Sequence, residues 1–268
     1  MHGMSQADLK RYATVASRAA VAVGSLLRRY AGRPRTVGTK RSAIDLVTEV
    51  DRASERLIHN TLKRAYPTFG FLGEEGGARQ QASAYRWIVD PIDGTTNFVH
   101  GLPLFGVSIG LQHRNTMLAG VIYDPMSREL FVATKGGGAH LNGKRIRVSP
   151  TRRVSQSLLS TGFSTNFLKH DQPYLRWFQT FQRRSRGVRR LGSTVYCLAA
   201  VAAGRMDGFY ERDLWPWDMA AGILLVEEAG GRVTDLQGRP PSLDTGRLIA
   251  SNGLIHRELL RLLHHSAR

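Results

Sequence analysis

The sequence predicts an α/β protein, with an α+β first half over about residues 1–150 and a more strictly α/β second half over residues 151–268. In the first half, two helical patterns precede a run of short strands; in the second half, strands alternate with helices. With 268 residues, 42% of them apolar, the chain can bury a substantial core. No Pro- or Ser-rich linker separates the halves, so residues 1–268 are expected to form a single domain.

Two helices are expected near the start of this sequence. Apolar residues recur at three- and four-residue steps over residues 9–30, and Ser5 with Asp8 forms a candidate capping box before them. A second helix is predicted over about residues 51–66, with Leu57 on its buried face. Both helices should cover a core with one apolar side.

The remaining elements follow from alternation and turn signals. Strands are predicted at residues 105–113, 116–124 and 129–135, and then at 157–160, 187–191, 206–211, 232–235 and 247–251. Helices are predicted around residues 174–181, at 193–203 and 216–229, and after the last strand. The first three of these strands are separated by short turns, which indicates an antiparallel meander.

The most informative stretch is W-I-V-D-P-I-D-G-T-T-N-F, residues 87–98, where an apolar strand runs into two carboxylates. We expect the strand ladder to stop after Asp90, because Pro91 has no N–H group to donate. Asp93 can then point back toward Asp90, and two carboxylates that close repel unless a cation lies between them or one is protonated. Mg²⁺ takes oxygen ligands of this kind, and the carbonyl of Ile92 offers another.

The same stretch continues with G-T-T, which suits an anion. Gly94 lets the backbone approach closely, and N–H groups at the start of a helix attract phosphate. A D-P-x-D sequence alone would more often be a surface turn that caps a helix. Cation ligands followed directly by an anion-binding turn favour a metal–phosphate site.

Further carboxylates lie at other element boundaries. Glu74 ends a short strand pattern in F-G-F-L-G-E-E, and Asp218 lies near a predicted helix start in W-P-W-D-M-A-A-G. Each alone would be an ordinary loop or helix-start acid. With Asp90 and Asp93 they carry about −4 in total, which two Mg²⁺ ions would neutralise.

Charge and cysteine content limit the partners and the compartment. The net charge is +17, which attracts phosphates, acidic polymers and anionic membranes. The single cysteine, Cys197, excludes an internal disulfide and fits a reducing compartment. The apolar residues 19–27 lack a cleavage site and are too short to span a bilayer, so a cytoplasmic location with no membrane partner is expected.

A basic stripe suggests nucleic acid as a further partner. Arginines crowd into Q-R-R-S-R-G-V-R-R-L-G, residues 182–192, and Arg152 and Arg153 could extend the stripe. No aromatic residues are interleaved to stack on bases, which favours an ordinary solvated surface.

With these residues in place, the sequence closely resembles the inositol monophosphatase family of Mg²⁺-dependent, typically lithium-sensitive phosphatases. The motifs that carry the resemblance are K-R-S-A-I-D-L-V-T-E-V-D (40–51), G-E-E (73–75), W-I-V-D-P-I-D-G-T-T-N-F (87–98), G-S-T (192–194), D-G-F-Y-E (207–211) and W-P-W-D-M-A-A-G (215–222). The long central motif and the W-D-x-A-A-G element are highly specific in combination. The resemblance implies a layered α-β-α-β-α sandwich, usually a homodimer, that binds two or three Mg²⁺ per site.

The resemblance also implies a role for each site residue. The metal ligands would be Glu74, Asp90, the Ile92 carbonyl, Asp93 and Asp218. Asp51 would orient Thr95, which with Glu74 would position the attacking water. Gly94 and Thr95 would bind the phosphate, and the alcohol portion of the substrate would face Gly192, Ser193, Thr194, Glu211 and Asp218. One metal would lower the pKa of the water that attacks phosphorus in line, and a second would stabilise the departing alkoxide.

The implied substrate is inositol 1-phosphate or a related sugar or polyol phosphate. The D-G-T-T-N sequence resembles that branch of the family more than the nucleotide-phosphate branch, which often has a lysine where Thr96 lies. Histidinol phosphate and fructose bisphosphate stay open as substrates, and Thr194 departs from the alanine that many members have there. Because a bacterial branch is linked to transcription complexes, a regulatory protein that contacts nucleic acid or such a complex is the second hypothesis.

Overall fold

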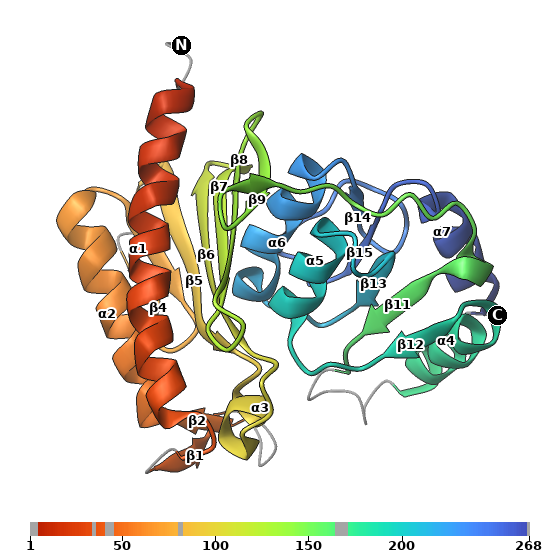
Figure 1. The fold of residues 1–268 in the computed structure, drawn as a ribbon, viewed down its shortest axis with the longest axis horizontal. Helices are drawn as coiled ribbons and strands as arrows, with labels where there is room; N and C mark the ends of the chain where they lie inside the picture. Colours follow the sequence, from red (N-terminus) through yellow and green to blue (C-terminus); the bar gives the residue numbers. More distant parts are fainter. Residues whose placement is uncertain (1–4, 34–35, 41–45, 80–82, 164–170, 267–268) are drawn as a thin grey trace.

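The computed structural model describes residues 5–33, 36–40, 46–79, 83–163 and 171–266. Its helices and sheets are stacked in five layers, α-β-α-β-α, from left to right in Figure 1. The helices are α1 (Gln6–Tyr30), α2 (Glu49–Ala65), α3 (Thr95–His100), α4 (Asp171–Arg184), α5 (Thr194–Ala202), α6 (Pro216–Glu228) and α7 (His256–Ser266), with a short 3-10 helix at Val154–Gln156. The layered α/β fold expected from the sequence is confirmed.

An eight-stranded sheet and a five-stranded sheet form the two β layers. The larger sheet has the order β10-β9-β8-β7-β6-β5-β3-β4, with β3 (Gly70–Gly73), β4 (Gly77–Arg79), β5 (Tyr85–Asp93), β6 (Gly106–His113), β7 (Thr116–Asp124), β8 (Glu129–Thr134), β9 (Gly138–Leu141) and β10 (Lys144–Arg145). From β5 to β9 each strand pairs antiparallel with the next one in the chain, which confirms the predicted meander. Strand β3 runs parallel to β5.

The smaller sheet is mixed rather than uniformly parallel. Its order is β12-β11-β13-β15-β14, with β11 (Leu158–Thr161), β12 (Gly187–Arg189), β13 (Gly208–Glu211), β14 (Arg232–Thr234) and β15 (Leu248–Ser251). Strand β11 pairs parallel with β12 and β13, whereas β15 is antiparallel to both β13 and β14. In a separate two-stranded sheet, β1 (Val37–Thr39) pairs antiparallel with β2 (Leu46–Thr48).

The first two helices show where local sequence signals succeeded and where one failed. The capping box of Ser5 and Asp8 is present at the start of α1. Helix α2 begins two residues earlier than expected, because the side chain of Thr48 accepts hydrogen bonds from the backbone N–H groups of the first turn. The prediction for Leu57 was wrong: its side chain is 38% exposed, and the core side of α2 instead carries buried polar groups such as Glu55.

Strand β5 extends beyond the point where the sequence predicted its end. The ladder with β6 pairs Asp90 with Ser108, shifts register across Pro91 and Ile92, and resumes with Asp93 opposite Gly106. Proline therefore interrupts the ladder without ending the strand, because the partner strand tolerates a bulge where no N–H is donated. The bulge lies in the stretch that carries the two carboxylates of the central motif.

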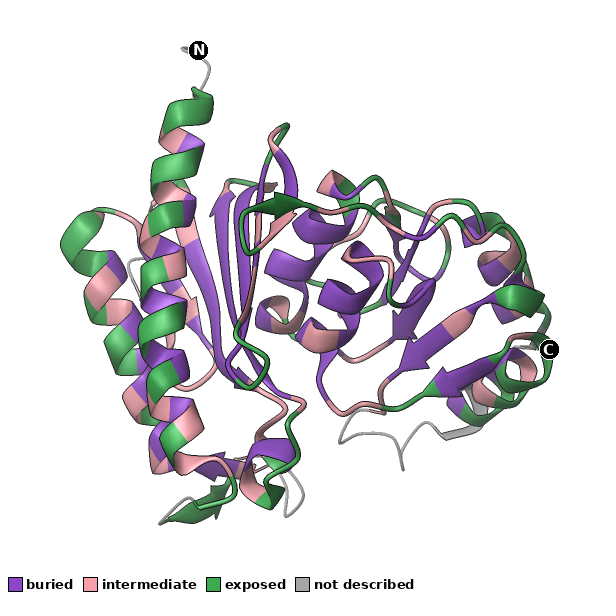
Figure 2. Cartoon of the chain, in the orientation of Figure 1, coloured by how far each residue is buried: buried purple, intermediate pink, exposed green. Residues whose placement is uncertain are grey.

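Three apolar clusters fill the four spaces between the layers, and Figure 2 shows buried residues along the strands of both sheets and along α5 and α6. Helix α6 is buried along most of its length, and its start is tied to the large sheet by a 3.1 Å hydrogen bond from Ser108 Oγ to the carbonyl of Trp217. This bond holds the first turn of α6 beside the end of β5. Among the described residues, no helix has the length and apolar composition needed for a membrane span.

Candidate active site

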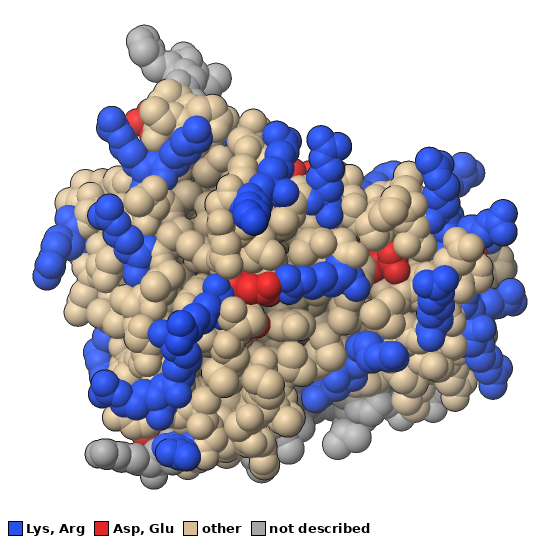
Figure 3. Space-filling model, in the orientation of Figure 1, with Lys and Arg blue, Asp and Glu red and all other residues tan. Residues whose placement is uncertain are grey.

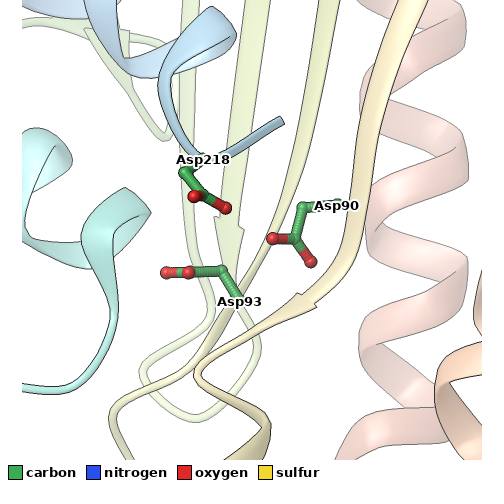
Figure 4. Close-up of side chains that lie close together, drawn as sticks. All are labelled: Asp90, Asp93 and Asp218. Atoms are coloured by element: carbon green, nitrogen blue, oxygen red, sulfur yellow. The ribbon is translucent and has the colours of Figure 1, made fainter. Parts of the chain in front are cut away.

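Three carboxylates meet where β5 ends and α6 begins. Asp90 and Asp93 come from β5, Asp218 comes from the first turn of α6, and the three side chains converge in Figure 4. One carboxylate oxygen from each lies within 4.8 Å of those from the other two. Residues more than 100 positions apart are thus brought together by the hydrogen bond between β6 and α6.

The electrostatics of this cluster favour a cation. Burial raises the pKa of Asp90 well above its usual range, and the charges of Glu74, Asp93 and Asp218 raise it further. Burial and the charges of Asp93 and Glu74 do the same to Asp218, and burial raises the pKa of Asp93 to about 6. Only oxygen ligands are present in the cluster, and the adjacent Ile92 carbonyl adds another. This donor set fits a hard divalent cation, which would relieve the repulsion.

Asp93 is also bound to the start of α5. Its Oδ2 accepts hydrogen bonds from the hydroxyl of Ser193 and from the backbone N–H of Val195, the latter at 2.9 Å. These bonds bring the G-S-T motif of the second half against the central motif of the first. One carboxylate oxygen is therefore fixed in direction by a helix N-terminus.

Glu74 lies beside the cluster and is paired with Lys40. The Nζ atom of Lys40 is 2.9 Å from Glu74 Oε1 and 2.5 Å from Glu75 Oε1. Burial still raises the pKa of Glu74 to about 7 despite this positive charge. Lys40 thus compensates part of the acidic charge, whereas residues 41–45 of the K-R-S-A-I-D-L-V-T-E-V-D motif lie outside the described residues.

Asp51 and Thr95 are neighbours in space although they are 44 residues apart. Thr95 Oγ1 lies 3.3 Å from Asp51 Oδ1 and 3.1 Å from the carbonyl of Ile92. The other oxygen of Asp51, Oδ2, accepts hydrogen bonds from the backbone N–H and the hydroxyl of Thr48, in the capping box of α2. The start of α2 therefore holds Asp51 in place to contact Thr95.

Gly94 lies in the turn between Asp93, at the end of β5, and the start of α3. Its φ of +92° lies in the left-handed region, and a Cβ there would come within 3.0 Å of the carbonyl oxygen of Leu104. Glycine is therefore required by both conformation and space. The turn brings Gly94 close to the carbonyl of Gly192, at the other side of the site.

Asn97 is a buried residue of the site whose role was not predicted from the sequence. Its Nδ2 donates to the carbonyl of Leu104 at 2.7 Å and to the carbonyl of Leu191 at 2.8 Å. It therefore joins the segment after α3 to the segment before α5. Its place in the central motif was visible from sequence, but its long-range partners were not.

A small cavity adjoins Asp93 on the side of the smaller sheet. It has a volume of about 100 Å³ and is lined in part by Gly192, Ser193, Thr194 and Glu211. Burial raises the pKa of Glu211 to about 8. Cys197 also lines this cavity, and burial raises the pKa of its thiol, as expected for a packed side chain and not for a nucleophile. All the residues predicted to face the alcohol portion thus border one space, except Asp218, which lies in the carboxylate cluster.

Comparisons with known proteins identify relatives of this chain. The model of the inositol monophosphatase family matches residues 8–268. An inositol-1-monophosphatase of Mesorhizobium japonicum is 46% identical over 218 residues, which are 81% of this chain and 82% of that protein. The Nus factor SuhB of Pseudomonas aeruginosa is 43% identical over 252 residues, which are 92% of this chain and 93% of that protein.

Solved structures show the same likeness. The structure of the inositol monophosphatase from Anabaena (Nostoc) sp. PCC 7120 superposes with a TM-score of 0.89 at 40% identity, and the match covers 96% of this chain and 97% of the other. The match therefore extends across both halves of the chain. The chain belongs to the inositol monophosphatase family.

Proposed function

We propose that this protein is a Mg²⁺-dependent phosphomonoesterase that hydrolyses inositol 1-phosphate or a related sugar or polyol phosphate. The observation that carries the proposal is the convergence of Asp90, Asp93 and Asp218 beside a polar cavity that contains Glu211. A buried cluster of carboxylates needs cations, and the cations in turn attract a phosphate. The cavity next to them has polar groups for the alcohol portion.

The metal ligands in this proposal are Glu74, Asp90, the Ile92 carbonyl, Asp93 and Asp218. Two or three Mg²⁺ ions would bind to this set. Bound Mg²⁺ supplies a water of lowered pKa and neutralises negative charge on the phosphate and the leaving oxygen. In the structure, the ammonium group of Lys40 is paired with Glu74 Oε1. For Glu74 to bind a cation through this oxygen, Lys40 would have to move away.

The protein groups orient the attacking water and the phosphate. Thr95 donates its proton toward Asp51, which directs the hydroxyl lone pairs to accept a hydrogen bond from the water. Glu74 would hold the same water from the other side. Backbone N–H groups at Gly94 and Thr95 would bind the phosphate, and the cavity residues from Gly192 to Thr194 with Glu211 would contact the alcohol portion.

Phosphate release with and without Mg²⁺ tests the proposal. The wild-type protein is expected to release phosphate from inositol 1-phosphate when Mg²⁺ is present, and Asp218→Asn is expected to be inactive. Asp244→Asn, at an exposed acid away from the carboxylate cluster, is the matched control and should behave as wild type. A screen that includes histidinol phosphate and fructose bisphosphate ranks the substrates. Absence of turnover on every one of these phosphates would overturn the enzyme assignment.

A regulatory role in contact with nucleic acid is the second candidate function. Figure 3 shows Lys and Arg spread over the visible face with few acids among them, and a hollow of about 280 Å³ on α4 is lined by Arg176, Arg183 and Arg184 together with Gln179 and Thr180. A relative that matches most of the chain is named Nus factor SuhB. We include a weak contact with RNA or a transcription complex on this basis.

Salt-dependent RNA binding separates this role from catalysis. The double variant Arg183→Gln/Arg184→Gln should lose affinity for single-stranded RNA and reduce the slope of log K against log salt by about 1.4, since each phosphate contact contributes about 0.7. A double variant at the exposed Arg11 and Arg18 of α1 is the control. Equal RNA affinity of the wild type and both variants would show that α4 is not the contact surface.

We further propose that the protein is cytoplasmic, forms a homodimer and is inhibited by lithium.

A further inference from the structure

The carboxylate of Glu211 is held in one direction by two neighbours. Glu211 is the last residue of β13 and is 6% exposed, and its Oε2 accepts a 3.1 Å hydrogen bond from Thr194 Oγ1 at the start of α5. On its other side lies Gly162, where a Cβ would come within 2.1 Å of Oε1 and 2.2 Å of Oε2. The absence of a side chain at Gly162 makes room for this carboxylate.

The two oxygens of Glu211 are not equivalent. Among the described residues, Thr194 alone donates a hydrogen bond to this carboxylate, and it does so to Oε2. Glu211 lines the cavity of about 100 Å³ that Asp93 also lines, and no described residue donates a hydrogen bond to its Oε1. A ligand in the cavity can supply the missing donor, so it gains affinity by donating a hydroxyl hydrogen bond to Oε1.

We propose that Thr194 is a specificity-determining positioning residue: by binding Glu211 Oε2 it directs Oε1 to accept a hydroxyl of the alcohol portion, so that the cavity selects polyol phosphates over phosphates of apolar alcohols. This inference rests on the proposed phosphatase function, because it concerns the substrate of the same site. A threonine is suited to the role, since its hydroxyl donates to Glu211 while its main chain begins α5. An alanine there would remove the one hydrogen bond that the described residues donate to this carboxylate.

A pair of substrates with the same ring isolates this effect. Inositol 1-phosphate and cyclohexyl phosphate both carry the phosphate that the metal site needs. They differ in the ring hydroxyl groups, and only inositol 1-phosphate can donate a hydroxyl hydrogen bond to Glu211. Wild-type kcat/KM should favour inositol 1-phosphate by roughly a hundredfold or more, as expected for a site that binds a substrate hydroxyl. In Thr194→Val, which keeps the shape of the side chain, that preference should fall by up to about tenfold, the upper end of what one hydrogen bond contributes.

The kinetic constants distinguish positioning from a structural effect. The loss in Thr194→Val should appear mainly as a raised KM for inositol 1-phosphate, whereas the constants for cyclohexyl phosphate should stay near those of wild type. Thr194→Ser retains the hydroxyl and should restore the preference. Thr234→Val is the matched control: this buried threonine does not line the cavity and donates its hydroxyl to the carbonyl of Asp235 at 2.8 Å, so the preference between the two substrates should be unchanged.

Each other outcome has a defined meaning. If the wild type hydrolyses neither substrate with Mg²⁺, the proposed function fails and this inference with it. If it hydrolyses both equally well, the phosphatase assignment stands and the role of Thr194 is overturned. The role is also overturned if Thr194→Val keeps the wild-type preference, or loses activity on both substrates by the same factor.

Discussion

The backbone N–H of Val195 donates a 2.9 Å hydrogen bond to Oδ2 of Asp93, a residue that lies 102 positions earlier in the chain. The hydroxyl of Ser193 binds the same oxygen. The N-terminus of α5 therefore fixes one oxygen of a carboxylate on β5, across the boundary between the two halves. The remaining oxygen can then contact the neighbouring acids or a cation that lies among them.

Asp93→Asn is expected to abolish turnover while leaving the fold intact. The amide oxygen can still accept from the N–H of Val195, but the charge that attracts the cation is lost. Changes in groups that merely support metal ligands cost about 10- to 100-fold, so loss of a ligand should reduce kcat/KM by at least about 100-fold. Phosphate release measures the activity, and circular dichroism with thermal melting measures the fold. Wild-type turnover, or an unfolded variant, would contradict the metal role of Asp93.

The metal-free protein should lose stability as the pH rises. Folding raises the pKa of Asp93 to about 6, of Glu74 to about 7 and of Glu211 to about 8, so the stability they contribute is full below their unfolded pKa near 4 and is lost as the pH rises through these values. His256 acts oppositely, because burial lowers its pKa to about 4 and its contribution is lost as the pH falls below about 6.5. Between about pH 6.5 and 8, the change in the free energy of unfolding therefore reflects the buried acids and not His256. Asp90→Asn should flatten the decline there by removing repulsion within the cluster.

Denaturant unfolding in EDTA at several pH values tests this prediction. The free energy of unfolding of the wild type should decrease across the interval, and saturating Mg²⁺ should suppress the decrease because bound cations offset the carboxylate charge. The control is Asp244→Asn, at an exposed acid that should leave the pH dependence as it is in the wild type. A wild-type stability that rises over the same interval would contradict the raised pKa values.

Thr95 and Thr96 are adjacent, but their environments predict different effects on activity. Thr95 Oγ1 lies 3.3 Å from Asp51, whereas the side chain of Thr96 is exposed. Thr95→Val should lower kcat by about 10²- to 10⁴-fold, the usual effect of losing a group that positions a reacting proton. Thr96→Val should retain activity near that of wild type. Equal kcat values for the two variants would show that the hydroxyl of Thr95 does not orient the water.

Local patterns in the sequence were sufficient to predict much of the site. Asp90, Ile92 and Asp93 lie close together in the chain, so their proximity could be predicted without a fold. The position of Asp218 in the first turn of a helix also followed from the proline before it. Their positions at element boundaries suggested that these segments could converge, and the family resemblance supplied the ligand set, because no local rule places the start of α6 beside β5.

The predictions that failed or were incomplete depend on long-range packing. Leu57 is exposed because α2 directs Glu55 inward, and the oxygen Oε2 of Glu55 accepts from the backbone N–H of Glu75 at 2.8 Å. The continuation of β5 past Pro91 depends on how β6 pairs with it. Sequence periodicity reports which residues are apolar and does not report which polar groups find a buried partner.

Asn97 provides the clearest test of such a long-range contact. Its Nδ2 donates to the carbonyls of Leu104 and Leu191, so Asn97→Ala leaves two acceptors without their donor and should cost about 2 kcal/mol in the free energy of unfolding. Asn97→Asp should cost more, since it has a similar shape but places an acceptor against two carbonyl oxygens. Both variants should also raise KM, because one released segment contains Gly192 and the carbonyl of Leu104 in the other lies against Gly94. Urea unfolding and kinetics measure these effects, with Asn115→Ala at an exposed turn position as the control. Wild-type stability of Asn97→Asp would show that the two segments are held together by other contacts.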